Sequence, residues 1–259
     1  MKPLLIITGA NGQVGSFLAK SWAGSRQPLL LLYHKDSSRL EALRDQSGIH
    51  LRSCDLRDLD ELKASVEEAC HILNAVPASL VHTAAVRSYD AQTMANGDPE
   101  IWQEVFGTNV TMACNVLKAC LPGMLEQKFG RIVLFGSNVV STGLNRGSAY
   151  AAAKAAIVNL ARSVALETAP DNVLINSISP APVETDLKSD FEGEYLAFRQ
   201  SYFEAYRRLS PTGKLISLDE IRHLSELLLS SGLANLNGQN IVLDGGLSAP
   251  LLNPQGTGS

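Results

Sequence analysis

Short apolar runs alternate with helical stretches along the whole chain, and this alternation constrains the fold more than any other feature. Each run is apolar throughout rather than apolar at every second position, and each is followed by a stretch with helical spacing. Strands of this kind, joined by helices, are typical of a parallel sheet covered on both faces. The expected strands are Leu4–Thr8, Leu29–Tyr33, Ile49–Ser53, Leu80–Thr83, Arg131–Phe135, Leu174–Ser179 and Asn240–Leu243.

Helical patterns fill the intervals between these runs. Right-handed crossovers through such helices predict an α/β fold with a doubly wound parallel sheet. The 259 residues contain no internal repeat and no linker, so we expect one domain over residues 1–259. The expected helices are Gly12–Ala23, Leu56–Cys70, Ile101–Glu126, Tyr150–Thr168 and Leu218–Leu229.

Charge and composition exclude several classes of function. The net charge is -4 and no region gathers enough Lys and Arg to neutralise a run of phosphates, so nucleic acid is not an expected partner. No apolar run is long enough for a bilayer or for a signal peptide, which predicts no membrane contact and a cytoplasmic location. The four cysteines form no CxxC pair and the histidines lack metal-ligand spacing, so we expect reduced thiols and no metal.

A glycine-rich turn follows the first expected strand. In TGANGQVG, Gly9, Gly12 and Gly15 recur every third residue. A strand that turns abruptly into a helix needs the backbone angles that glycine tolerates, and a pyrophosphate at the helix N-terminus needs positions without side chains. An ordinary strand-to-helix turn could carry the same glycines, but the position in the first strand–helix–strand unit favours a dinucleotide site. Asn11 could line this turn or be a surface residue.

The residues after the second strand indicate which dinucleotide is bound. NAD binders usually carry an acidic residue here for the ribose hydroxyls, whereas a basic residue suits the 2′-phosphate of NADP. The strand ends in Tyr33-His34-Lys35, without an acidic residue before Asp36 and with Arg39 one turn later. Lys35 could also be a solvated surface lysine. The pattern favours NADP(H) over NAD(H).

Tyr150 and Lys154 lie four residues apart in an alanine-rich helical stretch, so both side chains leave one face of the helix. An unperturbed tyrosine has a pKa of about 10, and a neighbouring ammonium lowers that pKa because it stabilises the phenolate. Ser137, at the end of the preceding strand, could hydrogen-bond a substrate oxygen where negative charge accumulates. Taken alone, a tyrosine–lysine pair is most often an exposed helix pair. With the glycine turn and the serine, it indicates general acid/base chemistry at a carbonyl oxygen.

Together these residues resemble the short-chain dehydrogenase/reductase family, in its compact single-domain branch and most closely in the 3-oxoacyl reductase type. The resemblance extends from Thr8 to about Gly246 and implies a Rossmann fold. The matching pieces are TGANGQVG (8–15), CDL (54–56), VHTAA (81–85), GTNV (107–110), GRIVLFGS (130–137), YAAAK (150–154), INSISPAPVET (175–185) and LDGG (243–246).

The resemblance implies a role for each matching residue. The catalytic set would be Asn109, Ser137, Tyr150 and Lys154, with Asn109 supporting a water that links Lys154 to bulk solvent as a proton relay. Asp55 would bind the adenine amino group. The implied cofactor-binding residues are Thr8, Gly9, Asn11, Gly12, Gln13, Val14, Gly15, His34, Lys35, Asp55, Leu56, Ala84, Ala85, Tyr150, Lys154, Pro180, Val183 and Thr185.

The sequence departs from the compact-branch pattern at three places. Gly12 is the middle glycine and Gln13 takes the position that glycine usually holds, which gives the TGxxGxxG motif of the extended branch. The usual NNAG strand end is HTAA (82–85), and the usual PG pair is Pro180-Ala181. None of these changes removes a member of the catalytic set. Chain length and the LDGG motif fit the compact branch, because extended members carry a larger C-terminal substrate domain.

Segment 186–214 interrupts the alternation of strands and helices. It carries six of the thirteen Phe and Tyr residues among many charges, which predicts one or two amphipathic helices inserted before the last strand. The resemblance implies that this insertion covers the substrate. Its rings could shape a pocket for a large apolar carbonyl compound or simply pack inside the protein. Arg199, Arg207 and Arg208 could meet an anionic substrate or could be solvated helix charges.

These expectations combine into one predicted function and two alternatives. The prediction is an NADPH-dependent oxidoreductase that reduces a ketone or β-ketoacyl carbonyl to an alcohol, with Tyr150 as general acid/base. A sugar-nucleotide epimerase or dehydratase, suggested by TGxxGxxG and HTAA, and a non-catalytic NADP(H)-binding regulator are the alternatives. The resemblance implies a homodimer or homotetramer joined through Ile101–Glu126 and Tyr150–Thr168, although the small-residue face of the latter could pack internally.

Overall fold

The computed structural model describes residues 1–87 and 93–249. Their strands form one sheet in the order β3-β2-β1-β4-β5-β6-β7, and every neighbouring pair is parallel. This is the predicted doubly wound fold of the Rossmann type. From β1 to β3 the strands are added on one side of β1, and from β4 to β7 they are added on the other side. The strands are β1 (Lys2–Thr8), β2 (Leu29–Tyr33), β3 (Ile49–Ser53), β4 (Ala75–His82), β5 (Gly130–Phe135), β6 (Val173–Pro180) and β7 (Asn240–Leu243).

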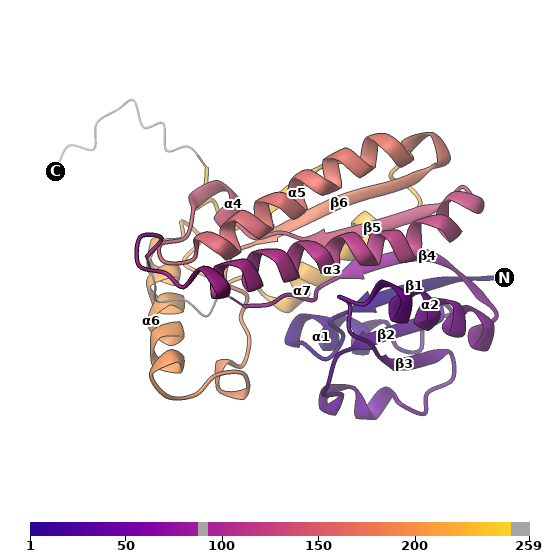
Figure 1. The fold of residues 1–259 in the computed structure, drawn as a ribbon, viewed down its shortest axis with the longest axis horizontal. Helices are drawn as coiled ribbons and strands as arrows, with labels where there is room; N and C mark the ends of the chain where they lie inside the picture. The colour runs from indigo at the N-terminus through magenta and orange to yellow at the C-terminus, as the bar shows by residue number, and fades with distance from the viewer. Residues whose placement is uncertain (88–92, 250–259) are drawn as a thin grey trace.

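Helices cover both faces of the sheet (Figure 1). Of the described residues, no helix is at once long and apolar enough to cross a membrane. The α-helices are α1 (Gln13–Trp22), α2 (Leu59–Leu73), α3 (Pro99–Glu126), α4 (Val139–Thr142), α5 (Ser148–Thr168), α6 (Gly193–Leu209) and α7 (Leu218–Leu229). Short 3-10 helices are η1 (Ser38–Leu43), η2 (Ala169–Asp171) and η3 (Leu187–Ser189).

The apolar strands feed two separate cores. In β1, Leu4 and Ile6 point to the core beneath α2, α3 and α5, whereas Leu5 and Ile7 point to the core beneath α1 and α7. All four side chains are at most 3% exposed. Burying a side chain of this size stabilises the fold by about 1.5–3 kcal/mol. The strands are apolar throughout because both of their faces are buried.

Several element boundaries differ from the prediction, and the starts of β4 and α2 have a clear physical cause. β4 begins at Ala75 rather than Leu80, although it contains Pro77, a residue that argues against a central strand. Pro77 stands opposite Leu4, and the register of β1 and β4 shifts directly after this pair, so the proline is accommodated at an irregularity. α2 begins at Leu59 rather than Leu56, because the Asp58 side chain accepts the amide hydrogens of residues 60 and 61 and caps the helix.

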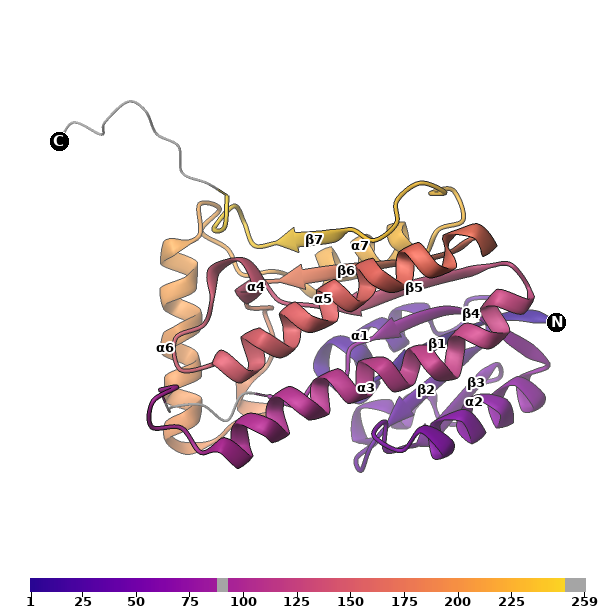
Figure 2. The ribbon, with the colours of Figure 1, turned by 45° about the horizontal axis from the view of Figure 1, so that its top comes forward.

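The insertion forms η3 and α6. α6 stands across the side of the sheet to which the arrowheads of β6 and β7 point (Figure 2). In open parallel sheets, ligands bind outside the carboxyl ends of the strands. α6 is therefore placed at the edge where the predicted site residues gather.

Candidate active site

The glycine turn joins the carboxyl end of β1 to α1. Gly9 has a φ of +66°, a left-handed conformation that favours glycine. A Cβ on Gly9 would lie 2.6 Å from the backbone nitrogen of Ala84, and a Cβ on Gly15 would lie 2.3 Å from the carbonyl oxygen of Gly9. Gly12 is the N-cap of α1 and has no side chain to occupy the helix N-terminus. The turn therefore fits the pyrophosphate of a dinucleotide.

Hydrogen bonds fasten the ends of β1 and β4 together beside this turn. The Thr8 Oγ1 and His82 Nδ1 atoms lie 2.7 Å apart, and the Thr83 hydroxyl donates to the Thr8 carbonyl at 2.7 Å. Burial, with a smaller contribution from the charge of Lys154, lowers the pKa of His82 to about 3. His82 is therefore a neutral structural partner of Thr8 near neutral pH.

The loop after β2 is ordered by Asn11. Its amide nitrogen donates to Asp36 Oδ2 at 2.7 Å, and its amide oxygen accepts from the backbone nitrogen of Arg39 at 2.8 Å. The Arg39 guanidinium donates to Asp190 at 2.9 Å and to the Asn11 carbonyl at 3.1 Å. His34 and Lys35 are exposed. Of the two cations predicted to meet a 2′-phosphate, Lys35 is the accessible one.

Asp55 follows β3 in the same region. Hydrogen bonds from the Arg57 side chain hold its pKa at about 2, with the closer contact at 2.6 Å. His34 Nε2 lies 3.9 Å from the same carboxylate. Leu56 is buried in the core. Asp55 is thus ionised and oriented by its neighbours near the expected adenine site.

Ser137 and Tyr150 line one cavity at the carboxyl end of the sheet. Ser137 follows β5, and Tyr150 lies in the first turn of α5. The cavity has a volume of about 1080 Å³, and Pro180, Val183 and Thr185 after β6 also line it. The structure therefore places the predicted serine and tyrosine in one space together with the residues predicted to contact the nicotinamide.

Lys154 lies one turn after Tyr150 and is fully enclosed. Its Nζ donates to the Phe135 carbonyl at 2.8 Å and lies 5.6 Å from the centre of the Tyr150 ring. Burial lowers the pKa of Lys154 to about 8. The ammonium form still predominates at pH 7, because one pH unit below a pKa leaves about nine tenths of a base protonated. A buried positive charge therefore lies beside the Tyr150 ring.

Asn109 lies on α3 and is 1% exposed. Its amide nitrogen donates to the carbonyls of Val86 and Val105, at 3.0 and 2.7 Å. Its amide oxygen accepts from the Val86 backbone nitrogen at 3.1 Å. Asn109 thus holds α3 against the segment after β4 that contains Ala84 and Ala85. The predicted water relay from Lys154 stays a prediction.

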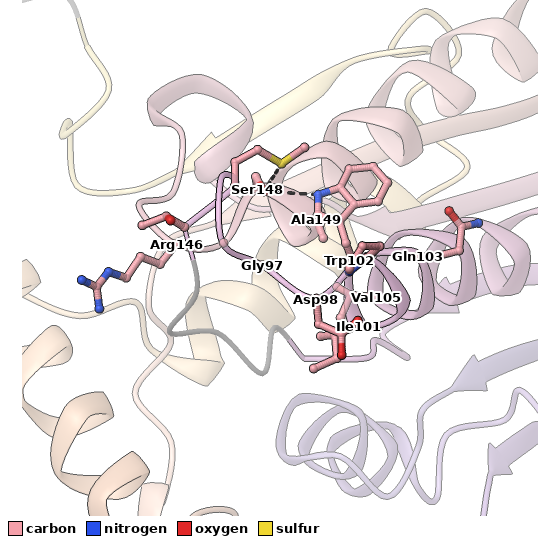
Figure 3. Close-up of a pocket in the computed structure, with 13 residues that line it drawn as sticks. Gly97, Asp98, Ile101, Trp102, Gln103, Val105, Arg146, Ser148 and Ala149 are labelled. Atoms are coloured by element: carbon pink, nitrogen blue, oxygen red, sulfur yellow. Dashed lines mark hydrogen bonds between the residues drawn. The ribbon is translucent and has the colours of Figure 1, made fainter.

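A second, smaller cavity lies between the N-terminal ends of α3 and α5 (Figure 3). It has a volume of about 330 Å³. Trp102 donates to Ser148 Oγ at 3.2 Å across this cavity, and its ring stacks on Phe106. Arg146 lines both cavities. The smaller cavity contains none of the residues predicted for catalysis.

Comparison with known proteins decides the family. The model of the family described as enoyl-(acyl carrier protein) reductase matches residues 9–248. The chain belongs to the short-chain dehydrogenase/reductase family. This membership confirms the resemblance seen in the sequence and implies an oxidoreductase that binds NAD(P)(H).

Individual relatives cover nearly the whole chain. Oxidoreductase UcpA of Salmonella typhimurium is 29% identical, over 95% of this chain and 94% of its own length. The 3-oxoacyl-[acyl-carrier-protein] reductase FabG of Escherichia coli is 27% identical, over 94% of this chain and 96% of its own length. Levodione reductase shares the fold, with a TM-score of 0.83, 23% identity and coverage of 96% and 98% of the two chains.

In this short-chain dehydrogenase/reductase, one connection between the candidate site and the insertion was not predicted from the sequence. Asp190 is paired with Arg39 and with Arg87, at 2.9 and 3.1 Å. Gln13 Nε2 donates to Asp190 Oδ2 and to the Asp186 carbonyl, both at 2.7 Å. Burial alone would raise the pKa of Asp190, but the hydrogen bonds from Gln13 and Arg39 outweigh it and lower that pKa. We call these contacts the Asp190 clasp.

The clasp gives Gln13 a role that motif reading did not reveal. Only the departure from the usual glycine marked this position in the sequence, and nothing there indicated a partner far along the chain. The part of the cavity wall that α6 forms was easier to predict from the sequence. Its lining residues Tyr195, Phe198, Tyr202 and Phe203 follow helical spacing, which the aromatic content of the insertion already suggested.

Proposed function

We propose that this protein is an NADPH-dependent reductase that converts a ketone or β-ketoacyl carbonyl to an alcohol. The observation that carries the proposal is the presence of Ser137 and Tyr150 in one cavity, with the Lys154 ammonium enclosed beside the Tyr150 ring. A hydroxyl pair with an adjacent buried cation suits a carbonyl oxygen that gains negative charge during reduction. The name of the E. coli relative, an oxoacyl reductase, supports the same substrate chemistry.

Each residue of the set then has a defined task. When bound, the reduced nicotinamide supplies the hydride that the carbonyl carbon receives. Ser137 donates a hydrogen bond to the carbonyl oxygen, and Tyr150 transfers its hydroxyl proton to that oxygen as the C=O bond becomes C–OH. Lys154 stabilises the tyrosinate that remains, and Asn109 supports the water through which the proton is replaced.

The preference for NADPH rests on Lys35. Its ammonium is exposed after β2, where the 2′-phosphate is expected, while Arg39 is engaged by the Asp190 clasp. Asp36, the next residue in the sequence after Lys35, accepts hydrogen bonds from Asn11 and Ser38. Lys35 is therefore the cation that favours the extra phosphate.

Architecture and assembly complete the proposal. Residues 1–259 form a single domain, in which segment 186–214 is the insertion that covers the substrate. The protein acts in the cytoplasm. The functional unit is a homodimer or homotetramer joined through α3 and α5. Ala155 of α5 is exposed and Leu166 is 82% exposed, so these two apolar side chains are available to a second copy, whereas Ala161 is buried within the protomer. Sedimentation analysis measures the assembly directly.

The decisive experiment compares Tyr150→Phe with Tyr33→Phe, a matched change outside the cavity. Wild-type enzyme should oxidise NADPH with a ketone or a β-ketoacyl thioester and leave an enoyl thioester unreduced. Tyr150→Phe should keep NADPH binding and lower kcat by about 10²- to 10⁴-fold, the usual contribution of a general acid. Tyr33→Phe should retain its kcat. Full turnover by Tyr150→Phe would refute the proposed mechanism.

A further inference from the structure

The wall that α6 contributes to the main cavity contains a charged residue among aromatic ones. The residues of α6 that line the cavity occupy one helical face. Four of them are aromatic, and Arg199 carries a positive charge. They are Glu194, Tyr195, Phe198, Arg199, Tyr202 and Phe203.

Aromatic rings hold the Arg199 guanidinium in place. Its central carbon lies 5.2 Å from the ring centre of Phe203, 5.4 Å from that of Phe191 and 5.7 Å from that of Tyr202. All three distances are within the range of cation–π attraction. The rings therefore position the guanidinium without using its N–H donors.

One of those donors lacks an acceptor in the part of the chain that the structure describes. The Nε of Arg199 is buried and has no hydrogen-bond partner, and no ion pair joins Arg199 to a described acidic residue. Other arginines of this region are paired: Arg39 and Arg87 with Asp190, and Arg207 with Glu204. A buried donor without an acceptor costs free energy, and an acceptor on a bound ligand would remove that cost.

Three arginines and two carboxylates line the cavity, so its lining as a whole carries a net positive charge. Arg87 is already paired with Asp190, whose carboxylate also binds Arg39 in the Asp190 clasp. Glu194 lies exposed in the first turn of α6, and Arg146 lies on the loop before α5. Arg199 lies against three rings, whereas Arg87 contacts the Phe191 ring at 4.5 Å.

We propose that Arg199 binds an anionic group of the substrate, so that the preferred substrates are keto acids rather than neutral ketones. This inference rests on the proposed carbonyl reduction at Ser137 and Tyr150. The planar guanidinium matches a carboxylate, and the rings around it accommodate an apolar or aromatic spacer between the acid and the carbonyl. Arg199 is then a specificity-determining residue that acts on substrate binding.

The test uses benzoylformate, benzoylpropionate and benzoylbutyrate, each beside its methyl ester, because this series varies the distance from carbonyl to carboxylate. Wild-type enzyme should prefer at least one acid over its ester. Arg199→Gln should lower kcat/KM for that acid by about 10- to 100-fold, mainly through KM, and leave the ester within about threefold. Arg199→Lys keeps the charge but loses the planar donor pair, so its loss should be smaller.

Two controls and one binding measurement separate the possible outcomes. Arg208→Gln changes an exposed arginine of the same helix and should leave the acid preference intact, as should Arg146→Gln. Calorimetric titration with phenylbutyrate, which cannot be reduced, should show binding to wild type and weakened binding to Arg199→Gln. If no carbonyl compound is reduced, the proposed function fails, and this titration still decides the role of Arg199.

The inference is overturned by any of three results. Wild-type enzyme would treat every acid and its ester alike, or Arg199→Gln would lower turnover of acid and ester equally, or Arg146→Gln would abolish the preference while Arg199→Gln retained it. The second result would assign Arg199 a purely structural part in the aromatic wall.

Discussion

Gln13 and Asp190 are joined by a hydrogen bond of 2.7 Å that connects the glycine turn to the insertion 186–214. The two residues lie in segments far apart in the sequence, and Asp190 is 15% exposed at its side chain. Arg39 and Arg87 bind the same carboxylate. The insertion is thus fastened to the part of the fold that would hold the cofactor.

Removing the charge of Asp190 should loosen this fastening. Asp190→Asn leaves Arg39 and Arg87 without their carboxylate, so the insertion should open about 10-fold more often, in line with the cost of breaking a partly buried charged hydrogen bond. Limited trypsin digestion followed by mass spectrometry would detect faster cleavage after Lys188. The matched control is Glu204→Gln, which breaks an ion pair within α6 and should not change the cleavage rate. Equal cleavage of Asp190→Asn and wild type would show that the clasp does not hold the insertion.

The glycines of the turn should differ in what they do. Gly9→Ala and Gly15→Ala place a Cβ against backbone atoms at 2.6 and 2.3 Å, so the thermal midpoint of the apo-protein should fall by about 2–10 °C. Gly12→Ala meets the Gly9 carbonyl only at 3.2 Å and should barely change that midpoint. It should nevertheless weaken NADPH binding, because its methyl group occupies the helix N-terminus. Scanning calorimetry measures the thermal midpoint, and titration with NADPH measures the affinity for the cofactor. Tight NADPH binding by Gly12→Ala would show that the pyrophosphate binds elsewhere.

His82 should make the protein sensitive to acid. Its pKa is about 3 in the folded protein, against about 6.5 in the unfolded chain. Between these values the unfolded chain binds a proton that the folded protein does not, so the free energy of unfolding should fall as pH drops from about 6.5 towards 3. In His82→Asn, urea denaturation at several pH values should show a shallower fall, while the exposed control His71→Asn should follow wild type. Parallel curves for His82→Asn and wild type would exclude this residue as the cause.

Lys35 should determine the cofactor preference. Lys35→Ala removes the accessible cation after β2, so the ratio of kcat/KM with NADPH to kcat/KM with NADH should fall by about 10-fold. Lys63→Ala, an exposed lysine on α2, is the matched control and should keep the wild-type ratio. A wild-type enzyme that turns over only with NADH would contradict the assignment of Lys35 before any variant is made.

The architecture was predictable because the relevant signals are local. Continuously apolar strands are visible in neighbouring residues, so the seven strands and their parallel arrangement were expected correctly, whereas the Asp58 cap that begins α2 was missed. Family membership was predicted from motifs such as YAAAK (150–154) and is confirmed. The early start of β4 was missed because Pro77 argues against a strand when the compensating irregularity in β1 is unknown.

The contacts around the candidate site depend on the tertiary fold. The sequence suggested that Lys35 and Arg39 act together, but packing turns Arg39 toward Asp190 and leaves Lys35 exposed. The charge of Arg199 was visible in the sequence, whereas its enclosure by rings from Phe191 and Phe203 required the relative placement of α6 and the segment before it. The chemical roles of Ser137, Tyr150 and Lys154 stay predictions until the variants are measured.

The Asp190 clasp also sets an order of events. The insertion forms a wall of the substrate cavity and is attached to the turn beneath which the cofactor phosphates would lie. With the proposed cofactor at this turn, we expect it to leave after the insertion has been released, and the insertion to be released after the cavity has emptied. Steady-state kinetics should accordingly follow a compulsory sequence, in which the nicotinamide cofactor enters before the carbonyl compound and departs after the alcohol.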